Sequence, residues 1–135
     1  MNHSEITNEI RKRVVSAAKF DPVKDLKLEG YTFDNSGKSL WVEEFFIGGD
    51  NRQMTNAREN IAGYLVQYDF CTPEGRGMEQ SKAMAETLET AFTGMIFEVN
   101  GTDCTCTSVS ISKNEGKTAN RVKVLLTFNV SRPLG

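Results

Sequence analysis

The sequence is poor in the residues that build catalytic and metal sites. Of its 135 residues, one is histidine and three are cysteine. His3 lies near the N-terminus, where little structure would hold an imidazole in place as a general base. Cys104 and Cys106 are two positions apart on an expected strand, a spacing that does not suit a disulfide between them. Zinc normally requires four ligands, so we expect no metal site and three partly buried thiols in a reducing compartment.

Long apolar runs and a strong charge of either sign are also lacking. No apolar segment approaches the roughly 20 residues that span a membrane, and the charged residues near the N-terminus do not match a secretory signal. The net charge of −2 argues against duplex nucleic acid as the main partner, because such binding usually shows a clustered basic surface. We therefore expect a cytosolic protein with no membrane partner and no sequence-specific nucleic-acid partner.

The motifs of the common enzyme classes are absent as well. The chain contains no G-x-S-x-G, G-x-x-x-x-G-K-[ST] or H-E-x-x-H. Glu43 and Glu44 are adjacent on an expected strand, so their carboxylates point to opposite faces and are poorly placed to act as a pair. Gly48-Gly49 and Gly75-x-Gly77 lack the spacing of a dinucleotide loop, and we interpret them as turn glycines. The residues thus give no support for catalysis.

What the chain does contain is the composition and patterning of one soluble domain over residues 1–135. Its 39% hydrophobic and 25% charged residues are typical of a globular protein with a modest core. Ser4 can cap a helix that reaches about Ala18. A connector from Phe20 to Lys38 follows, punctuated by proline and glycine. A short strand could lie inside it, because Tyr31 and Phe33 alternate with polar residues.

The rest of the chain predicts strands and a second helix. Leu40 to Ile47 carries apolar side chains on both faces, which favours either a central strand or a strand that packs on a neighbouring subunit. Period-two alternation marks strands at Ala62–Phe70 and Val122–Val130. An amphipathic helix between them ends at Phe92. Including the short segments that follow it, the pattern predicts an α+β fold, with a mostly antiparallel four- to five-stranded sheet and two helices packed on one face.

Two polar segments are candidates for binding a partner. The first, Gly48–Asn60, is long for a hairpin connection and is expected to be a loop. The second is the expected hairpin tip at Lys113–Arg121, a locally basic stretch. Either segment could instead be a solvated loop with no partner. The candidate partner-binding residues are Arg52, Asn56, Arg58, Lys113 and Lys117.

The order of elements between Trp41 and Phe92 resembles that of one family, the tail terminator and tail-completion proteins of long-tailed bacteriophages. An aromatic-led strand ends in Gly-Gly, and Gly63-Tyr64 opens a strand that ends in Asp69-Phe70. A turn with Pro73, Gly75 and Gly77 then leads into a helix with Ala83, Leu88 and Phe92. The resemblance extends from Leu40 to Pro133 and rests on the succession of these features.

The resemblance implies a virion structural protein that is not an enzyme and needs no cofactor. Tail terminators form hexameric rings that bind the last ring of the tail tube, stop its polymerisation and present a surface to the head-completion (neck) proteins. The implied partners are therefore further copies of the chain, the tail tube protein and a neck protein. The implied location is the tail–neck junction of the virion, after assembly in the host cytoplasm.

Two other readings stay open. One is a neighbouring neck or head–tail joining protein, which would also form rings. The other belongs to a different class: a small enzyme or ligand-binding domain with a pocket between helices and sheet. A solution mass that corresponds to a closed ring would favour an assembly protein. A deep pocket with convergent polar groups would favour an enzyme or ligand-binding domain.

Overall fold

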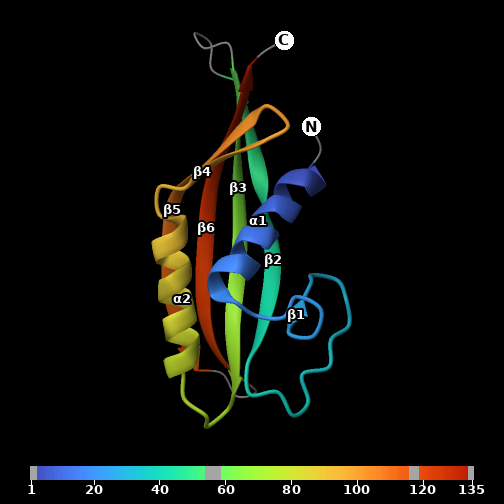
Figure 1. Cartoon of the computed structure of the whole chain (residues 1–135), viewed down its shortest axis with the longest axis vertical. Helices are drawn as coiled ribbons and strands as arrows, with labels where there is room; N and C mark the ends of the chain where they lie inside the picture. Colours follow the sequence, from blue (N-terminus) through green and yellow to red (C-terminus); the bar gives the residue numbers. More distant parts are fainter. Residues whose placement is uncertain (1–2, 54–58, 116–118, 134–135) are drawn as a thin grey trace.

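The protein is an α+β fold in which two helices cover one face of a curled sheet (Figure 1). The structure is a computed structural model that describes residues 3–53, 59–115 and 119–133. The elements are α1 (His3–Ala18), β1 (Leu26–Lys27), β2 (Trp41–Gln53), β3 (Glu59–Pro73), α2 (Glu79–Phe92), β4 (Ile96–Val99), β5 (Thr102–Glu115) and β6 (Ala119–Pro133).

The sheet has six strands in the order β1-β2-β3-β6-β5-β4, and it is mixed. All neighbours are antiparallel except β1, which pairs parallel to β2 through Leu26 and Val42. The expectation of four or five strands is therefore wrong in number. The expected short strand at Tyr31 and Phe33 is also wrong, because the connector forms its strand at Leu26–Lys27 instead. Two residues are too few to show a periodicity.

Two expected loops are shorter in the structure, because the strands beside them run on. Gly48–Asn60 is not one loop: β2 continues to Gln53, opposite Asn60 of β3. A β-bulge between Phe46 and Gly48 precedes this polar extension, and the ladder to β3 supplies the backbone hydrogen bonds that a loop would leave to water. Likewise β5 continues to Glu115 and β6 begins at Ala119.

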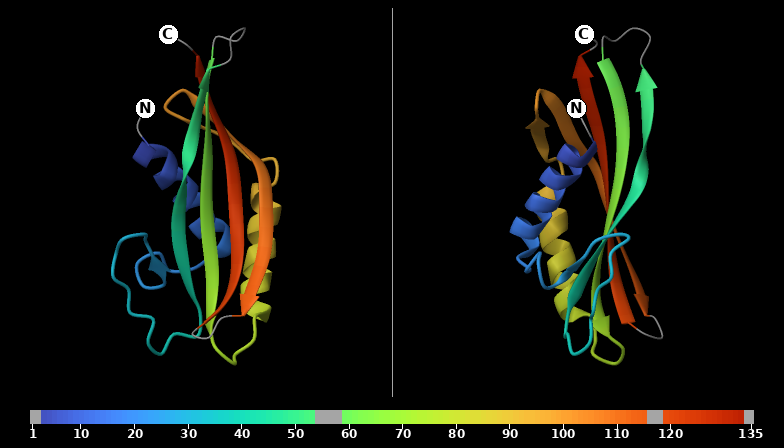
Figure 2. Two further views of the ribbon diagram at one scale, coloured as in Figure 1. Left: turned by 180° about the vertical axis from the view of Figure 1, so that it is seen from behind. Right: turned by 90° about the vertical axis from the view of Figure 1, so that its right-hand side faces the viewer.

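The hydrophobic core lies between the helices and one face of the sheet (Figure 2, right). Ile6, Ile10 and Val14 of α1 are fully buried at helical spacing. Strand β6 packs against α2, since Val122, Val124, Leu126 and Phe128 are buried in one cluster with Leu88 and Phe92. The rings of Phe92 and Phe128 meet edge to face, 6.0 Å apart.

A buried ion pair fixes α1 to the sheet. Arg11 donates from Nε and Nη2 to the two carboxylate oxygens of Glu44, at 2.9 and 2.6 Å. The Tyr68 hydroxyl donates to the same carboxylate at 2.5 Å. The Glu44 side chain is only 5% exposed, so these bonds offset the cost of burying its charge. The hydrogen bonds to Glu44 raise the pKa of Arg11, and burial raises the pKa of Tyr68 well above its ordinary value.

Candidate functional site

Neither of the two described helices packs on the second face of the sheet, and we treat this face as the candidate interaction surface. In the view from behind, β2, β3, β6 and β5 form a broad surface in front of both helices (Figure 2, left). Strand alternation brings odd-numbered residues of β3, of β6 and of β2 before its bulge to this side, in register as Phe45, Gln67 and Leu125. Phe45, Leu65 and Leu125 are half-buried there, and Ile47, at the bulge, is 52% exposed. We call this surface the open face.

A charged cluster lies on the open face near the end of the sheet where β2 and β6 begin and β3 ends. The Arg121 guanidinium donates to Asp69 Oδ2 at 3.0 Å and to Glu43 Oε2 at 3.2 Å. The Trp41 indole nitrogen donates to the same Glu43 oxygen at 3.0 Å, and the Gln67 amide donates to Asp69 Oδ1 at 2.7 Å. Each of these five side chains comes from β2, β3 or β6, so the cluster ties three strands together. Its polar groups are satisfied inside the chain.

The environment of this cluster stabilises a carboxylate and a neutral thiol. Burial raises the pKa of Glu43, but the hydrogen bonds from Trp41 and Arg121 outweigh it, and the net pKa lies below the ordinary value. Burial raises the pKa of the neighbouring Cys71 thiol to about 12. The thiolate is the nucleophilic form of cysteine, so Cys71 is not activated for covalent chemistry.

A shallow hollow crosses the open face beside the cluster. It has a volume of about 570 Å³ and is lined by aromatic, aliphatic and charged side chains, among them Phe45, Ile47, Gln67, Arg121 and Lys123. A broad depression with apolar and charged groups side by side matches the composition of protein–protein contact surfaces.

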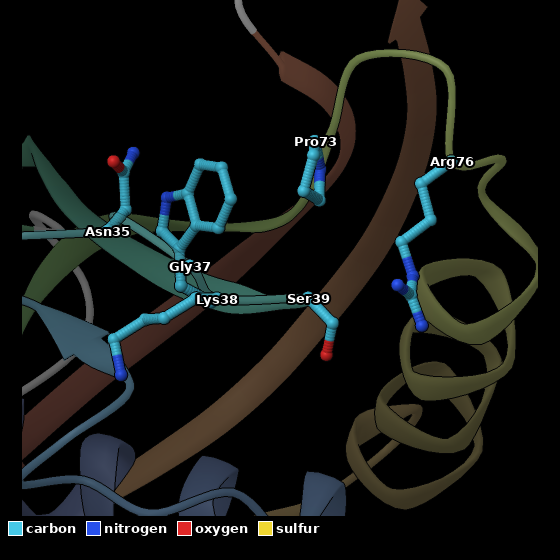
Figure 3. Close-up of a pocket in the computed structure, with 7 residues that line it drawn as sticks. Asn35, Gly37, Lys38, Ser39, Pro73 and Arg76 are labelled. Atoms are coloured by element: carbon cyan, nitrogen blue, oxygen red, sulfur yellow. The ribbon is translucent and has the colours of Figure 1, made fainter.

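A second hollow lies at the end of the sheet, between the connector and the turn before α2 (Figure 3). It has a volume of about 380 Å³, and Lys38, Trp41, Pro73 and Arg76 are among its lining residues. The charged end of Lys38 points away from Arg76 (Figure 3). Lys38 Nζ instead donates to Asp25 at 2.8 Å. These groups do not converge on a ligand position.

The structure places two of the five sequence-predicted binding residues, Arg52 and Lys113, toward opposite ends of the sheet. Arg52 occupies a position near the end of β2, opposite Ile61. Lys113 is exposed on β5 opposite Val122, level with Val42 at the other end of the sheet. Asn56, Arg58 and Lys117 lie outside the described residues. Their role in binding a partner stays a prediction.

Sequence reasoning missed the charged cluster. Glu43, Asp69 and Arg121 are far apart in the chain, and each was seen only within its own segment. No distinct sequence signal marks the cluster, because the second faces of β3 and β6 carry several further polar residues, among them Gln67, Lys123 and Asn129. Only the pairing of Glu43 with Asp69 in one ladder and of Cys71 with Arg121 in the next brings them into contact.

Within the described residues, no group of three His, Cys, Asp or Glu side chains is placed to hold a metal ion. Neither described helix has the length and apolar character needed to cross a lipid bilayer.

Comparisons with known proteins identify the fold and leave the function open. No model of a protein family matches this sequence, and no curated protein matches it. Chains of solved structures do match. One of them is similar over 96% of this chain and 96% of its own length, with a TM-score of 0.68 and 17% sequence identity. At that identity the likeness is one of fold, so the chain shares its whole architecture with at least one solved protein.

Proposed function

We propose that this protein is a structural assembly protein of a long-tailed bacteriophage, a tail terminator or tail-completion protein. In this role it forms a ring of six copies on the end of the tail tube, ends tube polymerisation and offers a surface to the neck protein. The proposal rests on the resemblance carried by residues Leu40 to Pro133. Its partners are other copies of the chain, the tube protein and a neck protein.

The observation that best supports this proposal is the open face. Four long strands present it, and half-buried Phe45, Leu65 and Leu125 lie around the exposed Ile47. The charged cluster lies further along the same strands, and its carboxylates are already paired with Arg121, so a partner can cover it without leaving a carboxylate unpaired. A stiff surface of this kind suits a protein that is built permanently into an assembly, because little conformational order has to be gained on binding.

Reconstruction of intact tails by electron microscopy tests the proposal. We expect six copies of this chain in a closed ring at the head-proximal end of the tube. Tails from a phage that lacks the gene should lack the ring and should vary in length. A ring at the head vertex would instead favour the neck or head–tail joining protein. Absence of the chain from the particle would refute an assembly role and favour an enzyme or ligand-binding domain.

A further inference from the structure

The sheet has two open edges, one on each side, and they lie on opposite halves of the molecule. On β2, the strand β1 pairs only with Val42 and Glu43. On β5, the strand β4 pairs only with residues 102–105. Among the described strands, none pairs with the outer side of β2 over residues 44–53 or of β5 over residues 107–115. Open edges of this length are templates for pairing with another strand.

Two hydrogen bonds identify which backbone groups these edges direct outward. The Cys106 N–H donates to the Met95 carbonyl at 2.8 Å, away from β6. Beyond the bulge between Cys106 and Ser108, the β5–β6 register places Val109, Ile111 and Lys113 in the same outward orientation. On β2, the Phe46 N–H donates outward to the Glu29 carboxylate at 3.1 Å. The register beyond the β2 bulge then directs Gly49, Asn51 and Gln53 outward.

We propose that these two edges pair with each other between copies of the chain: residues 47–53 of β2 in one copy form an antiparallel ladder with residues 107–115 of β5 in the next. This inference rests on the proposed function, because it specifies how neighbouring copies of a ring would join. The two stretches are of similar length and run in opposite directions in every copy. Copies placed side by side in one orientation therefore meet as antiparallel partners.

The shape of the edges favours pairing with a second copy of this chain over pairing with a strand of an unrelated protein. Strands β1 and β4 each pair with a few residues at the end of the edge that the neighbour would not reach. Two neighbouring copies can therefore fit together when one is shifted along the strand direction relative to the other. The contact is heterologous, since β2 of one copy meets β5 of the next, and repeated heterologous contacts generate rings or filaments.

The two open stretches are offset along the strand direction, and this offset determines how far the strands of a closed ring would tilt from the ring axis. Through Val124 and Tyr68, Ile111 at the middle of the open β5 stretch is level with Glu44. The middle of the β2 stretch 47–53 is Asp50, which pairs with Gly63, five residues from Tyr68 along β3 and roughly 17 Å away at a rise of about 3.3 Å per residue. Successive copies would repeat every four strands, roughly 19 Å. A closed ring then requires strands tilted by roughly 40°, within the range of closed barrels.

Sedimentation of the full chain over a range of concentrations tests the pairing. Lys113→Pro removes one outward N–H and adds bulk at the edge, and proline is tolerated on strand edges that face solvent. We expect this change to weaken self-association by at least about tenfold. Lys113→Ala keeps the N–H and removes only the side chain, so it should weaken self-association far less than Lys113→Pro does. Thermal melting of both variants verifies that they fold.

Amide hydrogen exchange gives a readout that does not depend on any variant. On association, the amides of Val109, Ile111 and Lys113 should become protected, whereas Ser110 and Ser112, which face β6, should be protected already. Association without added protection at those three amides overturns the pairing, and so does a chain that stays monomeric at about 1 mM. A six-fold ring on tails, found together with either result, would leave the proposed function standing with a different interface.

Discussion

At the scale of single residues, Phe128 is the most informative core position. It is fully buried and its ring contacts those of Phe92 and Phe97, each with 6.0 Å between centroids. Phe128→Ala should lower the free energy of unfolding by about 3–5 kcal/mol, because it removes these contacts and leaves a cavity. Denaturant melts measure this loss. Thr127→Ala, on the open face, should cost below about 1 kcal/mol. A loss that small for Phe128→Ala would contradict its place in the core.

Glu43 gives the stability of the fold a dependence on pH. Its pKa in the folded chain lies below the ordinary value of 4.5, so the unfolded chain takes up the proton first as pH falls. The stabilisation from Glu43 is therefore complete above about pH 4.5 and is lost below it, as pH falls through the lowered pKa. Glu43→Gln should cost about 1–3 kcal/mol at neutral pH and progressively less in acid.

Chemical denaturation at a series of pH values measures this difference. Glu98→Gln, an exposed change of the same chemistry on β4, is the matched control and should leave stability at neutral pH nearly unaltered. A difference between wild type and Glu43→Gln that stayed constant below pH 4.5 would argue that Glu43 acts through its shape and not through its charge.

At the scale of elements, the attachment of α1 to the sheet depends on the pair of Arg11 and Glu44. Arg11→Met should cost about 2–3 kcal/mol, since it leaves a buried carboxylate without its cation while Arg11 itself keeps partial access to solvent. Glu44→Met in the same chain should recover part of that loss, and unfolding of the four species gives the coupling. Glu9→Gln, which breaks the surface pair with Arg13, should cost about 0.5 kcal/mol. If the effects of Arg11→Met and Glu44→Met on the free energy of unfolding are additive, α1 docks through its apolar stripe alone.

The elements with a strong period were predictable from the sequence, and the others were not. Helix α1 and the alternating segments of β3 and β6 show regular burial that the spacing of apolar residues reveals. The polar end of β2 gives no such signal. Its strand structure comes from the ladder to residues 60–65 of β3, a contact between distant segments. The charged cluster was missed for the same reason, because Glu43, Asp69 and Arg121 meet only through two registers.

At the scale of the whole molecule, one side of the sheet is committed to the core and the other is available to partners. The helices use the even-numbered residues of β3 and β6, whereas the open face offers odd-numbered ones and a satisfied ionic cluster. Because the open face is separate from the edges of the sheet, the two surfaces can bind different partners. In the proposed ring, the edges would join copies of the chain, and the open face would remain for the tube or neck protein.

Ile47 is the position at which this division can be tested. It is 52% exposed at the bulge of β2, so Ile47→Asp should change the free energy of unfolding by less than about 1 kcal/mol. A carboxylate placed there would be buried without a partner whenever another protein covers the open face, which is strongly unfavourable. We therefore expect the variant to fold normally but to yield tails without the terminal ring and of uncontrolled length, as seen by electron microscopy in a complementation assay.

Val23→Asp is the control, since Val23 is 87% exposed in the connector. Normal tails from Ile47→Asp would show that the open face stays in solvent after assembly, and the partner surface would then have to lie on the helices or the edges.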